Sequence, residues 1–500
     1  LMLQACNGDS NNITFDDLDI STGDSYSSTA ITSFNIKPNS KVLAHLDSVF
    51  FTIDLLEARI FNADSLPYGT NVSKLVMNLG SETVSKITVK YTDAKTHEEK
   101  EITYGSSDSI NFNEPVTLTV LSANELYERT YDVKVNVHKV KPDSLCWGSL
   151  AYSSLPAASA PISQKTVKLG DDVYCLTQST SGYSVAMTAT PADNTSWQIS
   201  EMTASFVPVV ESFNATDDAL FILSDSGDLY TSADGKTWQS TGVSGWYSVI
   251  GGYGSKLLGV GRRNNNYHAA IYPADVQVET SPLPDGFPVS GHSQTISYTT
   301  EWSATPQAIF VGGRCADGSM SSSTWGFDGT RWVRFSDLPK NQALEGVALI
   351  PYTTFSVNTT NWTVKSYNTL IALGGRAADG SVSHKLYISR DWGLNWHISD
   401  DLMTLPEEMP ALSFAQGIVA DSVLGDGASA VSGWNYISTA APNKLWWEID
   451  EMSAIGRASA PVTSWACPYI YIFGGVAENG TLYDTVWRGI INRMTFKPLQ

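Results

Sequence analysis

The sequence predicts an all-β protein in which an N-terminal immunoglobulin-like β-sandwich is followed by a β-propeller. Three observations lead to this fold class. A motif of an apolar run, paired glycines, a polar turn, an aromatic strand and a tryptophan recurs in the second part of the chain. No long segment carries a sustained helical period. The part before the repeats consists of short alternating strands separated by turn residues.

The repeats are clearest in three places. One copy runs from Ile309 to Trp332, a second from Ile371 to Trp396, and a third from Tyr471 to Trp487. Repetition of one four-stranded unit is typical of a propeller. At about 45–50 residues a blade, the segment 142–500 predicts about seven blades, with six or eight as alternatives. The expected blade ends are Trp197, Trp238, Trp332, Trp396 and Trp447, and the segment 257–278 is a degenerate blade.

The last repeat lacks a recognisable outer strand after Ile491. Leu145, Cys146 and Trp147 form a short apolar strand at the start of the same domain. We therefore expect these residues to pair with the last repeat and to close the ring.

The N-terminal part divides at about residue 28. Residues 1–28 are rich in Asn, Asp, Ser and Gly and have the low apolar content of a disordered tether. Residues 29–141 contain strands such as 86–91, 116–120 and 131–137 with one apolar face. This pattern predicts the sandwich, whose expected role is that of a stalk.

Composition excludes several classes of function. The formal net charge of −20 argues against nucleic-acid binding, which needs clustered Lys and Arg. No metal site and no cofactor are expected, because the cysteines and the seven histidines show no ligand spacing. Disulfide pairing among Cys146, Cys175, Cys315 and Cys467 stays open. We expect a monomer.

The segment Leu3-Gln4-Ala5-Cys6 resembles the lipobox of bacterial lipoproteins. The resemblance implies lipidation of Cys6 and attachment to the membrane only through that lipid. It places the protein at the bacterial outer membrane or cell surface, with the periplasmic face as an alternative.

The repeats resemble two propeller families. The order of apolar run, paired glycines and tryptophan is similar to kelch repeats of galactose-oxidase type. Ser389, Asp391, Gly393 and Trp396 match the Asp box of sialidase-type propellers, and a version one residue shorter contains the set Ser232, Asp234, Gly235 and Trp238. The Asp, Gly and Trp residues of such a turn have structural roles. The whole architecture resembles surface lipoproteins of Bacteroides-type gut bacteria. The resemblance implies a function related to carbohydrates but no particular reaction.

The candidate ligand-binding residues surround one propeller face. Arg262, Arg314 and Arg376 follow glycines in comparable turns and would share the face opposite the Asp-box turns. They could grip a carboxylate, as sialidase-type catalysis requires, but ion pairs with neighbouring turn residues such as Asp317 and Asp379 are favoured. The expected channel-lining residues are His292, Glu345, Gln416 and Arg457. Glu345 is expected to be solvated rather than to act as a general acid or base.

Some aromatic residues are further candidates for stacking on sugar rings: Tyr253, Tyr267, Trp302 and Trp434. The leading functional prediction is a lipid-anchored envelope protein that binds a glycan or a surface protein on one propeller face without catalysis. No catalytic residue is assigned. The alternatives are an exo-acting glycoside hydrolase of sialidase type and a structural scaffold of an outer-membrane nutrient-uptake complex.

Overall fold

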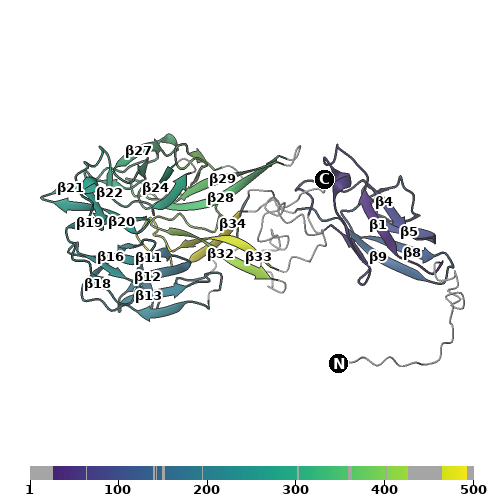
Figure 1. The fold of residues 1–500 in the computed structure, drawn as a ribbon, viewed down its shortest axis with the longest axis horizontal. Coiled ribbons are helices and arrows are strands. Elements are labelled where there is room, and N and C mark those ends of the chain that lie inside the picture. The colour runs from purple at the N-terminus through teal and green to yellow at the C-terminus, as the bar shows by residue number, and fades with distance from the viewer. Residues whose placement is uncertain are drawn as a thin grey trace, which may run out of the picture. The chain divides into compact units, whose positions relative to one another are not determined.

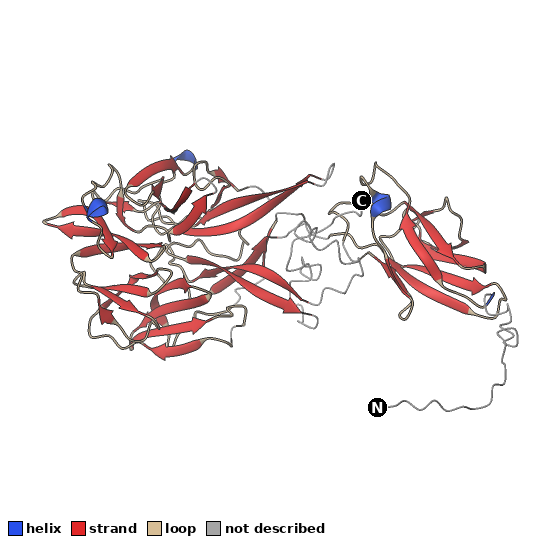
Figure 2. Ribbon diagram, viewed as in Figure 1, coloured by secondary structure: helices blue, strands red, loops and turns tan. Residues whose placement is uncertain are grey.

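The computed structural model describes residues 26–62, 65–138, 141, 144–148, 153–193, 195–300, 303–358, 363–399, 402–425 and 464–491. Contacts divide the chain into two compact units, one within residues 1–139 and one within residues 140–494. Strands dominate both units (Figures 1 and 2). The short helices in the described part are η2 (Leu46–Ser48), α1 (Val276–Glu279) and η3 (Pro339–Asn341). None of them has the length and apolar character needed to cross a bilayer.

The N-terminal unit is a β-domain with two sheets. One sheet has the order β2 (Thr52–Asp54), β3 (Arg59–Phe61), β9 (Glu128–Lys134), β8 (Val116–Ser122), β5 (Val84–Thr92) and β6 (Glu99–Thr103). The other has the order β1 (Ile31–Ile36), β4 (Leu75–Ser81) and β7 (Ser109–Ile110). Alternate residues of β8 are buried, as expected for a strand with one face in the core. The immunoglobulin-like topology stays a prediction.

The second unit is a β-propeller whose described residues form six blades. In chain order, blade 1 contains β11 (Pro161–Leu169), β12 (Asp172–Ser179), β13 (Gly182–Thr188) and β14 (Gln198–Glu201), and blade 2 contains β15 (Pro208–Ala215), β16 (Leu220–Ser224), β17 (Leu229–Ser232) and β18 (Gln239–Ser240). Blade 3 contains β19 (Trp246–Tyr253), β20 (Lys256–Arg263) and β21 (Asn266–Tyr272), and blade 4 contains β23 (Ile296–Thr300), β24 (Ser303–Val311), β26 (Ser323–Phe327) and β27 (Trp332–Asp337). Blade 5 contains β28 (Ala348–Asn358), β29 (Thr363–Leu373), β30 (Leu386–Ser389) and β31 (His397–Ile398), and blade 6 contains β32 (Gln416–Gly425), β33 (Ser464–Phe473), β34 (Val486–Ile491) and β10 (Leu145–Trp147).

The first strands of successive blades contact one another around a central channel, and β11 contacts β32 to complete the ring. A small sheet pairs β22 (Pro288–Ser290), which precedes blade 4 in the chain, with β25 (Arg314–Cys315), which lies between β24 and β26 of blade 4. Six blades are the lower alternative of the number that length predicts. The degenerate blade is the three-stranded blade 3, which extends from Trp246 to Tyr272 rather than from 257 to 278.

The predicted closing strand is confirmed. Leu145 pairs with Ile491 and Trp147 pairs with Gly489, so that β10 is the outermost strand of the last blade. The Leu145 side chain is buried in a core cluster together with residues of β29, β33 and β34. The N-terminal end of the propeller thus completes the blade made by its C-terminal end.

The paired glycines have a packing reason. Gly312 has φ of 69°, and a Cβ atom there would lie 2.3 Å from the carbonyl oxygen of Leu344 in the turn that leads into the next blade. Gly374 repeats this arrangement against Leu412 O at 2.1 Å. Only glycine adopts this conformation without steric cost and lets two backbones approach so closely. The glycine motif therefore fixes the spacing between blades.

The residues of the two predicted Asp boxes form hydrogen-bonded turns between the third and fourth strands of blades 2 and 5. The Asp391 carboxylate accepts from the Asn395 backbone N–H at 2.9 Å, and the Ser389 hydroxyl accepts from Gly393 N–H at 2.9 Å. The Trp396 indole donates to Thr324 Oγ1 of the preceding blade at 2.8 Å. In blade 2, Asp234 and Ser232 accept in the same manner, and the Trp238 indole donates to Gly235 O at 3.1 Å.

Candidate functional site

Strand direction decides which side chains share a face of the propeller. Every blade is antiparallel, so the start of its first strand lies on the same face as the turn between its second and third strands. We call this the glycine face, because it contains the paired-glycine turns 312–313, 374–375 and 474–475. Arg314 and Arg376 belong to second-to-third-strand connections, and Arg262 lies at the end of β20, the second strand of blade 3, so all three lie on this face. The Asp-box turns lie on the opposite face.

A cavity of about 360 Å³ lies where the first strands begin, at the glycine-face end of the central channel. Blades 1, 2, 3 and 6 contribute to its walls, as does the loop that leads into blade 4. It is lined by Gln164, Lys165, Val209, Glu211, Ser212, Tyr247, Ser248, Val249, Ile250, Ser290, Gly291, His292, Ser293, Phe414 and Gln416. Two predicted channel residues, His292 and Gln416, are therefore at the cavity.

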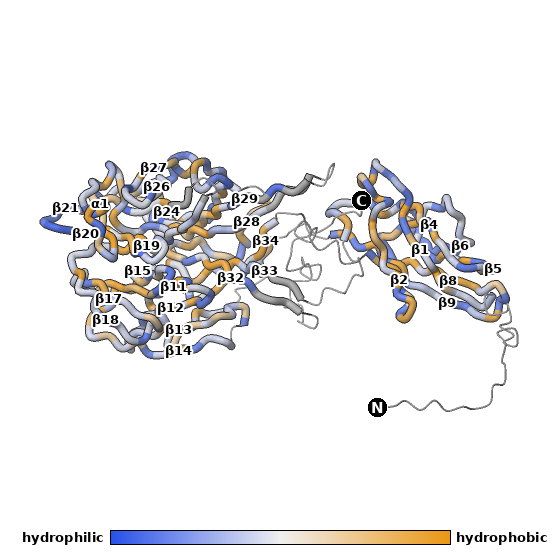
Figure 3. Tube along the Cα trace, viewed as in Figure 1, coloured by the Kyte–Doolittle hydropathy of each residue, from blue (hydrophilic) through white to orange (hydrophobic). Residues whose placement is uncertain are grey.

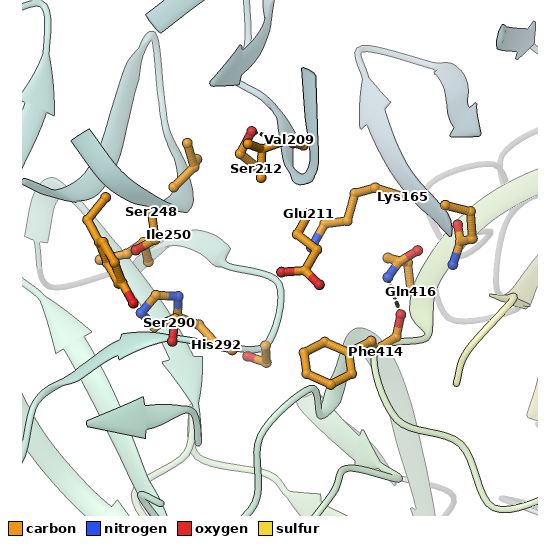
Figure 4. A pocket seen from close by; sticks show the side chains of 15 residues that line it. Lys165, Val209, Glu211, Ser212, Ser248, Ile250, Ser290, His292, Phe414 and Gln416 are labelled. Atoms are coloured by element: carbon orange, nitrogen blue, oxygen red, sulfur yellow. Dashed lines mark hydrogen bonds between the residues drawn. The ribbon is translucent and has the colours of Figure 1, made fainter. Parts of the chain in front are cut away.

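Lys165 and Glu211 are the oppositely charged side chains of the cavity wall. Figure 4 shows the Glu211 carboxylate pointing into the cavity between Lys165, His292 and Phe414. Burial lowers the pKa of the Lys165 ammonium, and the charge of Glu211 acts in the opposite direction. No hydrogen bond or ion pair joins the two groups among the contacts of the described residues. The Lys165 ammonium and the Glu211 carboxylate can therefore each form hydrogen bonds with a ligand in the cavity.

His292 is a neutral member of the wall. Its Nε2 lies 3.0 Å from the carbonyl oxygen of Pro288, and a carbonyl can only accept, so Nε2 is the protonated nitrogen. This tautomer makes Nδ1 an acceptor. Burial, helped by the positive charge of Lys165, lowers the pKa of His292 to about 4.

The low pKa of His292 predicts a pH-dependent stability. The unfolded chain takes up a proton at its ordinary pKa of about 6.5, whereas the folded protein resists protonation down to about 4. The stabilising contribution is therefore complete above pH 6.5 and is lost as the pH falls toward 4, by at most about 3 kcal/mol. Thermal unfolding of the wild type and of His292→Gln at pH 7.5, 5.5 and 4 checks this. An equal loss of stability in the two proteins would contradict it.

Glu345 is not solvated, contrary to the prediction. It lies in the turn before β28, is 7% exposed, and receives two hydrogen bonds from the Arg314 guanidinium, at 2.9 and 2.7 Å. Bonding to Glu345 raises the pKa of Arg314. The sequence interpretation erred because the partner comes from the preceding blade, a relation that local sequence does not reveal.

The predicted pairing of the arginines with neighbouring turn aspartates is also wrong. Asp317 and Asp379 instead accept from the serines two residues after them, which satisfies their own turns. Arg376 donates to Ala477 O at 2.6 Å in the last blade. Arg314 thus bonds blade 4 to the turn that leads into blade 5, and Arg376 bonds blade 5 to blade 6.

Arg262 has a third kind of environment, beside the rings of Tyr247 and Tyr267. Each guanidinium group thus has its own hydrogen-bond partner, while Arg262 and Arg314 both act electrostatically on Tyr247. Arg457 lies outside the described residues, as do Cys6, Trp302, Trp434 and Trp447. Tyr253 is buried and donates to Pro306 O, so its ring is part of the core.

Sequence reasoning missed Lys165, Glu211, Tyr247 and Phe414. Lys165 and Glu211 could have been found as charges on the first strand of a blade, where polar side chains face the channel. Phe414 could not have been found, because its positive φ of 57° is set by tertiary contacts and not by the local sequence. Its N–H donates to Gly346 O at 2.7 Å, and Gly346 N–H donates to Gly291 O at 2.8 Å, so these turns form one chain of hydrogen bonds beside the cavity. This chain holds a bulky residue in a glycine-like conformation at the site.

Comparison with solved structures gives matches of low similarity. The structure of YjhT matches at 11% identity and a TM-score of 0.38, with 66% of this chain and 95% of that chain covered. The N-terminal domain of Nup159 matches at 11% identity and 0.28, with 93% and 98% covered. YCF48 from Cyanidioschyzon merolae matches at 8% identity and 0.20, with 82% and 97% covered. At these values the similarities say nothing about a ligand.

The search of curated proteins gave no match. Family models, in contrast, cover both units. Residues 20–135 match the model described as the DUF6242 N-terminal domain. Residues 141–499 match the model described as the DUF6242 beta propeller domain. Since this second match alone spans more than half of the sequence, the chain belongs to the DUF6242 family.

Proposed function

We propose that the protein binds a terminal sugar residue of a glycan in the cavity on the glycine face, without catalysis. The observation that carries the proposal is a cavity of about 360 Å³ in which Lys165, Glu211 and His292 meet beside aromatic rings. The volume is at the lower end of the range for small-molecule sites, about 300–1,000 Å³. It suits one sugar residue better than a protein loop.

The chemistry of the wall fits sugar hydroxyl groups, which both donate and accept. The Glu211 carboxylate and His292 Nδ1 accept, and the Lys165 ammonium donates. Several other polar groups are already engaged: Ser212 donates to Val209 O, and Gln416 accepts from Thr166 N–H. Recognition would therefore depend on a few fixed groups, which is typical of specific small-ligand sites.

Binding without turnover is supported by the carboxylate content of the cavity. Glycoside hydrolysis uses two carboxylates about 5–9.5 Å apart in most families. Among the residues that line the cavity, Glu211 is the one acidic residue. The sialidase-type alternative would need arginines that converge on a carboxylate, whereas Arg314 and Arg376 are bonded to neighbouring blades. These contacts favour binding over the hydrolase and give no support to the scaffold.

We further propose that the protein is a lipoprotein of the cell envelope, anchored through Cys6. The lipobox-like segment supports this proposal. Incorporation of a labelled fatty acid into the wild type but not into Cys6→Ser checks it.

A glycan array followed by calorimetry tests the binding proposal. The panel contains galactose, N-acetylglucosamine, N-acetylneuraminic acid and oligosaccharides of mucin and plant glycans. We expect Glu211→Gln to weaken binding about 10- to 100-fold, because hydrogen bonds to a charged group contribute about 1.5–3 kcal/mol. Glu201→Gln, an exposed change on the outermost strand of blade 1, is the matched control. No binding to the panel, equal binding by Glu211→Gln, or release of sugar would each overturn the proposal.

A further inference from the structure

An aromatic cluster lies at the rim of the cavity, on blade 3. It consists of Tyr247 on β19, Arg262 on β20 and Tyr267 on β21, and we call it the rim cluster. The tyrosine rings meet edge to face, with centroids 5.0 Å apart. The Arg262 Cζ atom is 5.8 Å from the Tyr247 centroid and 5.6 Å from the Tyr267 centroid. Tyr247 is 41% exposed, so its ring is accessible from solvent.

The hairpin between β20 and β21 holds this cluster in place. Asn264 and Asn265 have φ of 50° and 63°, as a tight two-residue hairpin turn requires. The register sets Arg262 directly opposite Tyr267. The Arg262 guanidinium also donates to Asn265 Oδ1 at 2.9 Å, which fixes the cation against both rings. Figure 3 shows the tip of this hairpin as strongly hydrophilic. The Tyr267 ring is half-buried and packs against the apolar core of the blade, whereas the Tyr247 ring is exposed.

The rim cluster is continuous with the cavity. Tyr247 belongs both to the cluster and to the cavity wall. The backbone N–H of Arg262 donates to Gly245 O at 2.9 Å, which ties the hairpin to the start of β19. A chain of sugar residues that leaves the cavity on this side would meet the tyrosine rings next.

We propose that the rim cluster is a second sugar subsite, which holds the residue adjoining the one in the cavity. The ligand class is then an oligosaccharide of at least two residues. A pyranose ring presents an apolar C–H face to aromatic rings and hydroxyl groups to cations, and the cluster offers both surfaces. The guanidinium has five N–H donors, and a single one of them is engaged by Asn265. This inference rests on the proposed function of the cavity.

The test compares monosaccharides with matched disaccharides on the full chain. The pairs are galactose with galactobiose, N-acetylglucosamine with chitobiose, and N-acetylneuraminic acid with sialyllactose. For the pair that binds, we expect the wild type to bind the disaccharide about tenfold more tightly. Tyr267→Ala is expected to abolish this gain, and the ratio of the disaccharide affinity to the monosaccharide affinity of the same variant is the quantity compared, because Tyr267 contacts Tyr247 of the cavity wall. Tyr267→Phe keeps the ring and should keep the gain.

The outcomes separate the two proposals. Monosaccharide binding without a gain for the disaccharide overturns the subsite and leaves the cavity proposal in place. A gain that persists in Tyr267→Ala, with an unchanged melting temperature, also overturns the subsite. Absence of binding to every pair overturns both proposals.

Discussion

A chain that starts at Ala151 is expected to be less stable than one that starts at Lys141 by about 5 kcal/mol. The difference is β10, which pairs with β34 and closes the ring. Its loss removes Leu145, 7% exposed, from the core shared by blades 5 and 6, and a buried Leu truncated to Ala costs about 2–5 kcal/mol on its own. The indole bond from Trp147 to Thr404 O, 2.9 Å long, is lost as well.

Thermal unfolding of the two shortened chains measures this effect. Both lack the N-terminal β-domain, so the comparison isolates the strand. We expect the melting temperature of the shorter chain to be lower by on the order of 10 °C, at roughly 2 °C per kcal/mol for a large domain. Equal melting temperatures would show that β10 does not close the ring.

Arg314→Ala is expected to destabilise the propeller by about 3 kcal/mol. The Glu345 carboxylate is buried between two blades and would lose its two charge-assisted hydrogen bonds. Removing one partner of a buried pair costs about 3–5 kcal/mol, and the value is set at the lower end because the Arg314 side chain is 43% exposed. The double variant Arg314→Ala/Glu345→Gln should recover part of the loss, since an uncharged amide costs less to bury.

Arg331→Ala is the control for this prediction. Its ion pair with Asp328 joins side chains that are 72% and 43% exposed, and such surface pairs contribute about 0–1 kcal/mol. Urea unfolding of the three variants and the wild type gives the comparison. If Arg314→Ala kept full stability but lost glycan affinity, Arg314 would be a ligand-gripping residue, contrary to the present account.

The elements that the sequence predicts well are those with a local cause. The glycines that separate blades stand out because positive φ and close backbone approach leave no other residue type. The closing strand was predictable because Leu145 to Trp147 supplied what the last repeat lacked. The number of blades was less predictable from chain length. The strands β28 and β29 are long, so their blade uses more residues than an average blade does.

The partners of side chains on the glycine face could not be predicted. Arg314 has an aspartate three residues away, yet it pairs with Glu345 from the next blade. The cavity combines residues as distant as Lys165 and Phe414. Such contacts depend on how the ring closes, which no local pattern contains.

The most direct test of the account is a crystal structure of the full chain with the oligosaccharide that binds most tightly. We predict a terminal sugar residue bonded to Glu211 and Lys165 in the cavity, with the next residue against Tyr247 and Tyr267. A sugar bound on the Asp-box face, or on the N-terminal β-domain, with an empty cavity would contradict the central claim.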